Sequence, residues 1–286
     1  MRGNSIKSHC KLNLFLDVGK RQKDTKLHNI QSLVYLLNLH DEIKIKRVYK
    51  KSDVINFFGD FAKHVKKNNN SILRSFSLLR KKGFIKPGVH YQVSIKKKVP
   101  AFSGLGGGSS NSASIINFIL KKKKLNQKNL KYFSKLIGSD LKLFFYSNKI
   151  FQKNLNSFSA IKSKNRFHFV IVYPFKKCST KEIYSKVNSF KIINKNYNYK
   201  SRSKIKEVEY LKLKKNSLEK IVMKKFPSIE KVLIELQRIS SCQFSRLTGS
   251  GSACFGLFLS EKSAELGLKK IKKKFPNYWC VTGKTI

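Results

Sequence analysis

The residues best suited to chemistry in this 286-residue chain gather in one glycine-rich segment. Glycines occupy positions 104, 106, 107 and 108, and Ser109 and Ser110 follow them. The apolar run that continues through Leu120 predicts a helix beginning near Ser109. Glycines let backbone N–H groups turn toward one point, and a helix N-terminus adds a positive dipole end there. The segment therefore predicts a phosphate-binding loop.

Two common phosphate loops do not fit this segment. A Walker A loop needs a lysine before the serine pair, and a dinucleotide loop needs a third glycine where Ser109 stands. A dinucleotide-binding loop is also followed, about 20 residues further on, by an acidic residue that binds the ribose, and the sequence has none there. A turn that only lets a helix pack close to a strand is the simpler alternative, but it needs fewer glycines than this loop has.

A single carboxylate stands out after this loop. Asp140 is the only acidic residue between Asp60 and Glu182, and it follows Gly138 and Ser139 at the end of a predicted helix. Such an aspartate can simply form a turn. Beside a bound phosphate donor it can instead act as a general base that deprotonates an acceptor hydroxyl.

Lys11 is the cation most suited to accompany that carboxylate. The alternating pattern from Lys11 to Asp17 predicts a strand with Leu12, Leu14 and Leu16 on one face and Lys11 and Asn13 on the other. An ammonium near Asp140 would keep the carboxylate ionised and neutralise charge on a transferred phosphoryl group.

The other elements follow from periodicity, glycines and prolines, which predict both helices and strands. The polar stretch 149–165 predicts a boundary near Ile150, with one domain over 1–150 and a second over 151–286. The turn 249–251 is predicted to close a hairpin, although it could also bind an anion. We expect helices over 71–82, 127–137, 180–187, 204–226, 228–239 and 262–274, and strands over 42–49, 89–95, 141–146, 167–173, 242–247, 253–259 and 278–281.

Composition indicates a folded protein. Hydrophobic residues make up 41% of the chain, enough for a core despite the charge. The five cysteines are spread widely and form no C-x-x-C pair, which predicts buried or incidental thiols in a reducing compartment. No segment predicts a membrane span, so we expect a cytoplasmic protein without a membrane partner.

The charge raises the possibility of a nucleic-acid partner. The chain has 62 Lys and Arg against 15 Asp and Glu, a formal charge of +47. Such a charge attracts phosphate polymers. The lysines are distributed over the whole chain, however, and Asn, Ile, Phe and Tyr are also abundant, as an AT-rich genome would encode. We therefore expect no specific nucleic-acid partner.

Four segments together resemble the GHMP kinases: Ser8–Leu14, Pro100–Asn111, Gly138–Asp140 and Arg246–Ala253. Their order and spacing fit over nearly the whole length. The resemblance implies a two-domain GHMP kinase-like α+β fold, with an N-terminal domain like ribosomal protein S5 domain 2 and a C-terminal ferredoxin-like α/β sandwich.

The resemblance also implies the cofactors and the reacting groups. Lys11 and Asp140 match the family's catalytic pair, and ATP with Mg²⁺ is the expected phosphate donor. No Mg²⁺ ligand can be named from the sequence. The residues expected to bind ATP are Pro100, Ala101, Phe102, Ser103, Gly104, Leu105, Gly106, Gly107, Gly108, Ser109 and Ser110.

The closest resemblance is to family members of the non-mevalonate isoprenoid pathway. These phosphorylate the 2-hydroxyl of an alcohol that carries a cytidine diphosphate group. By position, Asn13 and His28 lie near that substrate and Tyr184 stacks on its cytosine, whereas Leu27 stands where the family has a second stacking aromatic. A GHMP kinase for another alcohol, such as homoserine or a mevalonate derivative, and a ribosome-associated basic protein remain alternatives.

Overall fold

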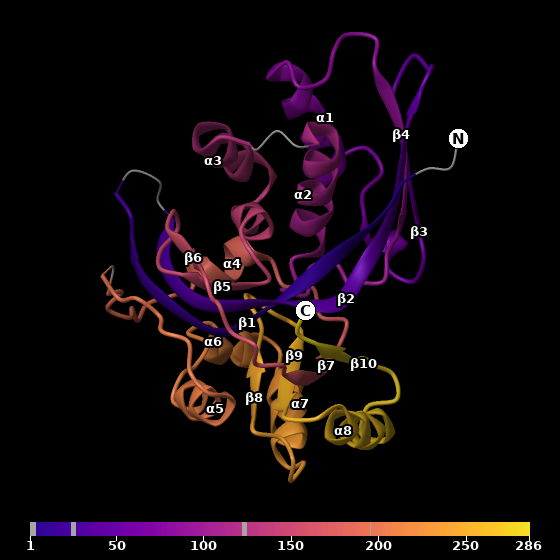
Figure 1. Ribbon diagram of the computed structural model, residues 1–286. Helices are drawn as coiled ribbons and strands as arrows, with labels where there is room; N and C mark the ends of the chain where they lie inside the picture. The colour runs from indigo at the N-terminus through magenta and orange to yellow at the C-terminus, as the bar shows by residue number, and fades with distance from the viewer. Residues whose placement is uncertain (1–3, 24–26, 122–124, 195) are drawn as a thin grey trace. The chain divides into compact units, whose positions relative to one another are not determined.

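A computed structural model describes residues 4–23, 27–121, 125–194 and 196–286 (Figure 1). The chain forms two compact units. The first comprises Met1–Cys10, Leu39–Ala101 and Gly106–Tyr146, and the second comprises Lys11–Asn38, Phe102–Leu105 and Ser147–Ile286. The last passage between the units therefore lies at residues 146–147. The domain boundary near residue 150 stays a prediction.

The first unit packs three helices on a sheet. The last part of β2 (His28–Val48) pairs antiparallel with β4 (His90–Lys96), which pairs parallel with β3 (Val54–Phe58). Helices α1 (Ser71–Lys81), α2 (Gly107–Leu120) and α3 (Gln127–Ile137) lie together in Figure 1. Apolar side chains of the strands and helices form one core, which includes Ile43, Val93, Phe76, Ile116 and Phe133.

Local sequence explains why these helices begin and end where they do. The Asn70 side chain caps α1 by accepting from the backbone N–H groups of Ile72 and Leu73. The apolar residues of α1 recur at helical spacing and are buried, and the helix stops before Gly83, which has a φ of +70°. The predicted helices 71–82 and 127–137 and the helix after the glycine loop are confirmed.

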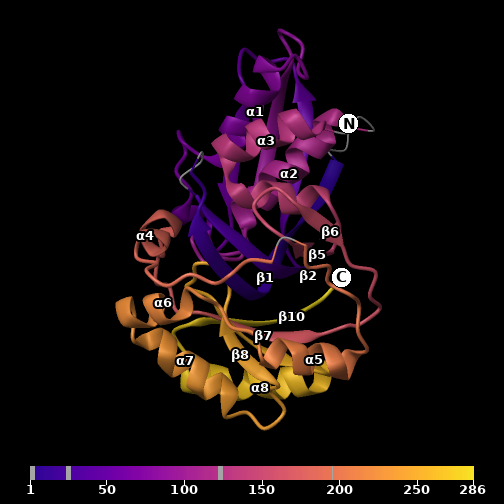
Figure 2. The same ribbon diagram turned by 90° about the vertical axis from the view of Figure 1, so that its left-hand side faces the viewer.

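The second unit contains a four-stranded antiparallel sheet. Its order is β10 (Trp279–Lys284), β7 (His168–Tyr173), β9 (Cys254–Phe258) and β8 (Phe244–Leu247). Helices α7 (Ser228–Gln237) and α8 (Glu261–Lys274) pack on this sheet, as Figure 2 shows. The hairpin predicted at 249–251 joins β8 to β9 and is confirmed.

The second unit also contains part of β1 (Asn4–Arg21) and part of β2. Residues 32–35 of β2 pair antiparallel with β5 (Lys149–Gln152), which pairs with β6 (Phe158–Ala160). The predicted strand at 42–49 is thus the last part of a longer strand, β2. Helix α4 (Thr180–Ser185) confirms the helix expected after residue 179.

Two predicted elements are wrong. The helix expected over 204–226 is two helices, α5 (Lys204–Lys212) and α6 (Glu219–Lys225). Between them, Leu16 of β1 exchanges backbone hydrogen bonds with Lys215 and Ser217, and Asn216 donates to the Leu247 and Gly249 carbonyls. This pairing satisfies the backbone better than a continued helix, and no local pattern reveals it.

The strand expected over 141–146 is a 3-10 helix, η2 (Ser139–Phe145). A second 3-10 turn, η1 (Ala62–His64), precedes α1. The backbone of Leu141 donates to the Gly138 carbonyl, and Leu141 and Leu143 are buried. A short apolar run of this kind does not distinguish a strand from a buried helical turn, which explains the error.

Burial of the cysteines and the character of the helices were also predicted from the sequence. All five cysteines are buried and none forms a disulfide: Cys10, Cys178, Cys242, Cys254 and Cys280. Among the residues that the structure describes, no helix has the length and apolar character needed to cross a bilayer.

Candidate active site

The first half of the glycine loop, Phe102–Leu105, packs within the second unit. The Ser103 carbonyl accepts from Ala253 N at 3.0 Å, and the Leu105 carbonyl accepts from Lys11 N at 3.0 Å. Gly104 has a φ of +82°, and a Cβ there would overlap the Thr248 carbonyl oxygen. Glycine is therefore required at 104 both for the backbone conformation and for the close approach to the hairpin.

The second half of the loop begins α2 in the first unit. Gly106 is the N-cap with a φ of +74°, and it brings no capping side chain to the N–H groups of the first turn. These groups have no acceptor inside the helix. The N-terminus of this 14-residue helix can thus donate several hydrogen bonds to an anion.

The two serines after the glycines have different surroundings. The buried Ser110 hydroxyl donates to the His9 carbonyl at 2.6 Å and lies 2.8 Å from Ser8 Oγ. Ser109 is partly exposed, and its Oγ lies 3.2 Å from where a Cβ on Gly138 would be. Ser110 therefore anchors α2, while Ser109 sits beside the segment that leads into Asp140.

Asp140 stands in the first turn of η2, partly exposed. Both η2 and α2 belong to the first unit, and the contact between Ser109 and Gly138 brings the N-terminus of α2 next to the Asp140 segment. The role of this carboxylate beside the phosphate loop stays a prediction. The contact also shows why a glycine suits position 138, since a side chain there would crowd Ser109.

Lys11 and Asn13 lie together in the second unit, on β1. The Lys11 ammonium donates to Asn13 Oδ1, and Asn13 Nδ2 donates to Ser32 Oγ at 2.8 Å. Asn13 N donates to Thr248 Oγ1 at 3.0 Å. Both side chains are buried, so the face opposite the leucines is not a solvent face. The Lys11 ammonium also lies beside Gly249, where an added Cβ would be 3.2 Å from it.

A buried arginine fixes the strand that carries Lys11. The Arg246 guanidinium donates to the carbonyls of Leu14, Leu211 and Lys214. Burial lowers the pKa of this guanidinium to about 10. Burial also raises the pKa of Glu219, whose carboxylate accepts from Leu247 N at 2.8 Å. Backbone groups of β1 and β8 are thus held by charged side chains inside the second unit.

His28 and Tyr184 meet in an aromatic cluster in the second unit. The His28 ring lies 5.8 Å from the Tyr184 ring and stacks on Phe190 at 5.6 Å. His28 Nε2 accepts from Arg21 Nε at 3.0 Å, so Nδ1 carries the proton and donates to the Gly19 carbonyl at 3.0 Å. Leu27 is 53% exposed. Sequence reasoning missed Arg21 and Phe190, because neither differs in type from many other residues of this chain.

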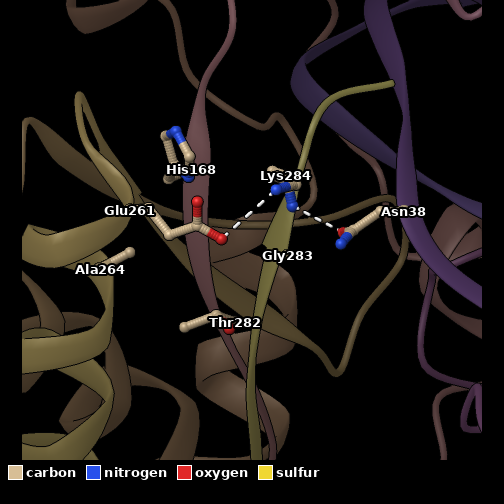
Figure 3. A pocket seen from close by; sticks show the side chains of 7 residues that line it. All are labelled: Asn38, His168, Glu261, Ala264, Thr282, Gly283 and Lys284. Atoms are coloured by element: carbon tan, nitrogen blue, oxygen red, sulfur yellow. Dashed lines mark hydrogen bonds and ion pairs between the residues drawn. The ribbon is translucent and has the colours of Figure 1, made fainter.

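Two hollows differ greatly in size. The cavity in Figure 3 has a volume of about 20 Å³ and is lined by residues that include His168, Glu261 and Lys284, so it has room for about one water molecule. An open hollow of about 480 Å³ lies in the first unit, between Asn68–Asn70, the α1 residues Leu73 and Arg74, and Leu136 of α3. Only the second has the size of a ligand site.

The described residues offer no group of three or more His, Cys, Asp or Glu side chains placed to hold a metal ion. Near the glycine loop, the oxygen donors of the first unit include the Ser109 hydroxyl, and the segment that carries the Asp140 carboxylate lies beside it. Mg²⁺ bound with a nucleotide takes most of its ligands from phosphates and water and needs only one or two carboxylates. These donors fit that mode and do not fit a metal held by protein alone.

Two family models match the chain. The model described as "GHMP kinases N terminal domain" matches residues 70–141, and "GHMP kinases C terminal" matches residues 205–277. The chain belongs to the GHMP kinase family. The first range contains the glycine loop and Asp140. The resemblance read from the four motifs is confirmed, and the protein is an enzyme, a phosphotransferase with an alcohol group as acceptor.

Two relatives and one solved structure are similar to this GHMP kinase over nearly its whole length. The chain is 36% identical, over its full length and that of the relative, to 4-diphosphocytidyl-2-C-methyl-D-erythritol kinase of Pelagibacter ubique. It is 31% identical to the kinase of the same name from Thermodesulfovibrio yellowstonii, covering 99% of this chain and 98% of the relative. A crystal structure of 4-(cytidine 5'-diphospho)-2C-methyl-D-erythritol kinase superposes with a TM-score of 0.72 at 21% identity, covering 98% of this chain and 99% of the other. The predicted fold class is confirmed.

Proposed function

We propose that this GHMP kinase transfers the γ-phosphoryl group of ATP to the 2-hydroxyl of 4-diphosphocytidyl-2-C-methyl-D-erythritol, a step of the non-mevalonate isoprenoid pathway. The observation that carries the proposal is the match, end to end, to curated kinases named for this substrate. The buried thiols, none of which forms a disulfide, fit the reducing cytoplasm that we expect for this chain.

The triphosphate of ATP binds, in this proposal, at the N-terminus of α2. The N–H groups that follow Gly106 donate to phosphate oxygens, and the helix dipole favours their charge. Mg²⁺ would be held by phosphate oxygens with Asp140 or Ser109, and it would supply charge neutralisation for the phosphates. Ser71 Oγ of α1 donates to the Gly108 carbonyl at 3.1 Å, so the start of α1 adjoins this helix N-terminus.

The nucleotide base has a candidate place in the same unit. The hollow of about 480 Å³ begins at Asn68–Asn70, directly before Ser71, and its wall includes the apolar Leu73 and Leu136. Leu136 is 42% exposed. A planar base laid on these leucines would cover apolar surface and place its phosphates toward Gly108.

Asp140 is the general base of the proposed reaction, and Lys11 stabilises charge. The carboxylate takes the proton of the acceptor hydroxyl while the hydroxyl oxygen forms a bond to the γ-phosphorus and ADP leaves. The support for Asp140 is its segment's contact with Ser109 at the start of α2. The support for Lys11 is its hydrogen bond to the loop residue Leu105 and its place beside Gly249.

The cytidine end of the substrate binds, we propose, at the aromatic cluster. Tyr184 offers a ring for stacking, worth about 1–3 kcal/mol per base. Phe190, 41% exposed and stacked on His28, is a second ring in the cluster and could take the place of the aromatic that the family has at Leu27. Asn13 and His28 would contact the substrate by hydrogen bonds. No specific nucleic-acid partner is part of the proposal.

The first experiment measures turnover with ATP and the cytidylated methylerythritol, beside homoserine and mevalonate as acceptors. We expect turnover with the cytidylated alcohol alone, inhibited by cytidine nucleotides. The shared fold does not distinguish these acceptors, so the comparison of turnover decides between them. Faster phosphorylation of homoserine or mevalonate would contradict the substrate assignment.

The second experiment tests the base. Asp140→Asn should lower kcat by about 10²–10⁴-fold, the usual contribution of general base catalysis, while ATP still binds because the α2 N-terminus is unchanged. The control is Asp60→Asn, which removes the preceding, exposed acid of the sequence and should leave kcat unchanged. An Asp140→Asn enzyme that turns over at the parent rate would show that Asp140 is not the base.

A further inference from the structure

Asp41 is a fully buried carboxylate of the first unit that the reaction outlined above does not use. Its Oδ1 accepts from the backbone N–H groups of Lys98 at 2.8 Å and Val99 at 2.9 Å. Its Oδ2 accepts from Asn111 Nδ2 at 3.0 Å and from the Lys97 ammonium. Four donors thus converge on one side chain, which is about the number that a carboxylate can accept.

These donors lie on the two sides of the glycine loop. Lys97, Lys98 and Val99 directly precede Pro100, where the loop begins, and Asn111 belongs to α2, just after the loop ends. The Lys97 ammonium lies close to the loop itself, since a Cβ on Gly107 would be 3.5 Å from it. Within the first unit, Asp41 therefore joins the segment that follows β4 and enters the loop to the helix that leaves it.

A loop rich in glycine needs such an anchor. Glycine loses more conformational freedom than any other residue when it is fixed, so the loop sequence does not hold its own N–H groups in place. Catalytic and phosphate-binding groups must be held within about 0.5 Å of the productive geometry by residues around them. A buried charge with four hydrogen bonds meets this need, because a partner that moves away leaves part of a buried charge without its donor.

We propose that Asp41 is a positioning residue that fixes the glycine loop in the conformation that binds the phosphates of ATP. The proposal rests on ATP binding at the N-terminus of α2, as stated under the proposed function. It concerns the order of the loop and the affinity for nucleotide, and it assigns Asp41 no contact with the substrate.

The test compares Asp41→Asn with Asp53→Asn. In Asp41→Asn the new amide keeps the size of the side chain, but its NH₂ faces the Asn111 and Lys97 donors. Asp53 is a matched control in the same unit: its carboxylate accepts from Arg80 and from Tyr91 N at 2.9 Å, and neither lies beside the loop. Both variants lose a hydrogen-bonded anion, fully buried at Asp41 and partly buried at Asp53, so both should lose stability.

Two measurements distinguish an effect on the position of the loop from a general loss of protein stability. The dissociation constant of Mg²⁺-ATP, measured by calorimetry without acceptor, should rise about tenfold to a hundredfold in Asp41→Asn and stay at the parent value in Asp53→Asn. Hydrogen exchange without nucleotide should speed up over residues 97–111 in Asp41→Asn alone. Equal changes in both variants, or no change in Asp41→Asn, would overturn the proposal.

If Asp41→Asn does not fold, a milder variant tests whether Asp41 positions the loop. Asn111→Ala removes only the tie to α2, and we expect a rise of up to about tenfold in the dissociation constant with faster exchange at the start of α2. Parent-like values for both would refute the role of Asp41. A parent protein that does not bind ATP would instead refute the proposed function, and the exchange data would still show whether Asp41 orders the loop.

Discussion

Gly104→Ala is the smallest change that should disable the glycine loop. Gly104 has a φ of +82°, a conformation that an alanine adopts at a cost of about 1–2 kcal/mol. The added methyl group would also overlap the Thr248 carbonyl oxygen and lie 3.2 Å from Gly251 N. Both neighbours are backbone atoms of the hairpin, so the overlap cannot be relieved by a side-chain rotation.

The magnitude follows from these two effects. Restoring van der Waals contact requires the loop and the hairpin to separate by roughly 1 Å, and overpacking of this kind costs about 1–3 kcal/mol. With the backbone strain, Gly104→Ala should lower the free energy of unfolding by about 2–5 kcal/mol. Displacement of a binding group by about 1 Å can reduce activity about 100-fold, so kcat/KM for ATP should fall by that order.

Gly88→Ala is the matched control. Gly88 has a φ of +72°, and nothing lies within 4 Å of an added Cβ. It should therefore show only the strain of about 1–2 kcal/mol and keep the parent kcat/KM. Urea unfolding and ATP titration of the kinase rate measure both quantities. If Gly104→Ala behaves like Gly88→Ala in both assays, the close approach to Thr248 does not position the loop and the reasoning is wrong.

Two further predictions concern stability. Burial raises the pKa values of Cys178 and Cys280 to about 11 and of Cys242 to about 12, from an ordinary value of 9.0. Above pH 9 the unfolded chain releases these protons first, so each thiol should lower the free energy of unfolding by about 1.4 kcal/mol per pH unit up to its folded pKa. The urea midpoint should therefore be lower at pH 10 than at pH 8, and this difference should be smaller in Cys280→Ala than in the parent protein. The same difference in both proteins would count against burial of the Cys280 thiol. Ser260 caps α8 by accepting from Ser263 N at 3.2 Å, so Ser260→Ala should cost about 1 kcal/mol in thermal unfolding, whereas the exposed Lys262→Ala should cost at most about 0.5 kcal/mol. Equal losses for the two variants would show that the cap contributes nothing.

Local patterns predicted the helices around the site well. The helix expected over 127–137 matches α3, since an N-cap, a helical repeat of apolar residues and a following glycine all lie within one short segment. The loop and the helix after it were predictable from the glycines and from the apolar run through Leu120. Asp140 was identified because the neighbouring sequence holds no other acid, which is again a local observation.

Features that depend on distant partners were not predictable. The break between α5 and α6 is made by β1, whose Leu16 is about 200 positions earlier in the chain. Arg21 and Phe190 meet at His28 although nothing in their own surroundings sets them apart. In each case the deciding contact is tertiary, and propensity and periodicity carry no information about it.

Asp41 shows the physical limit of sequence reasoning most clearly. Three carboxylates hold backbone N–H groups of distant segments: Asp41 accepts from Lys98 and Val99, Asp53 from Tyr91, and Glu219 from Leu247. Every residue except proline carries such an N–H, so the partner leaves no trace in residue type. A metal site or a phosphate loop can be recognised because its members are chemically special. A carboxylate that orders the backbone of a phosphate loop can be found only once the fold has brought the two together, even where the loop's own motif is plain in the sequence.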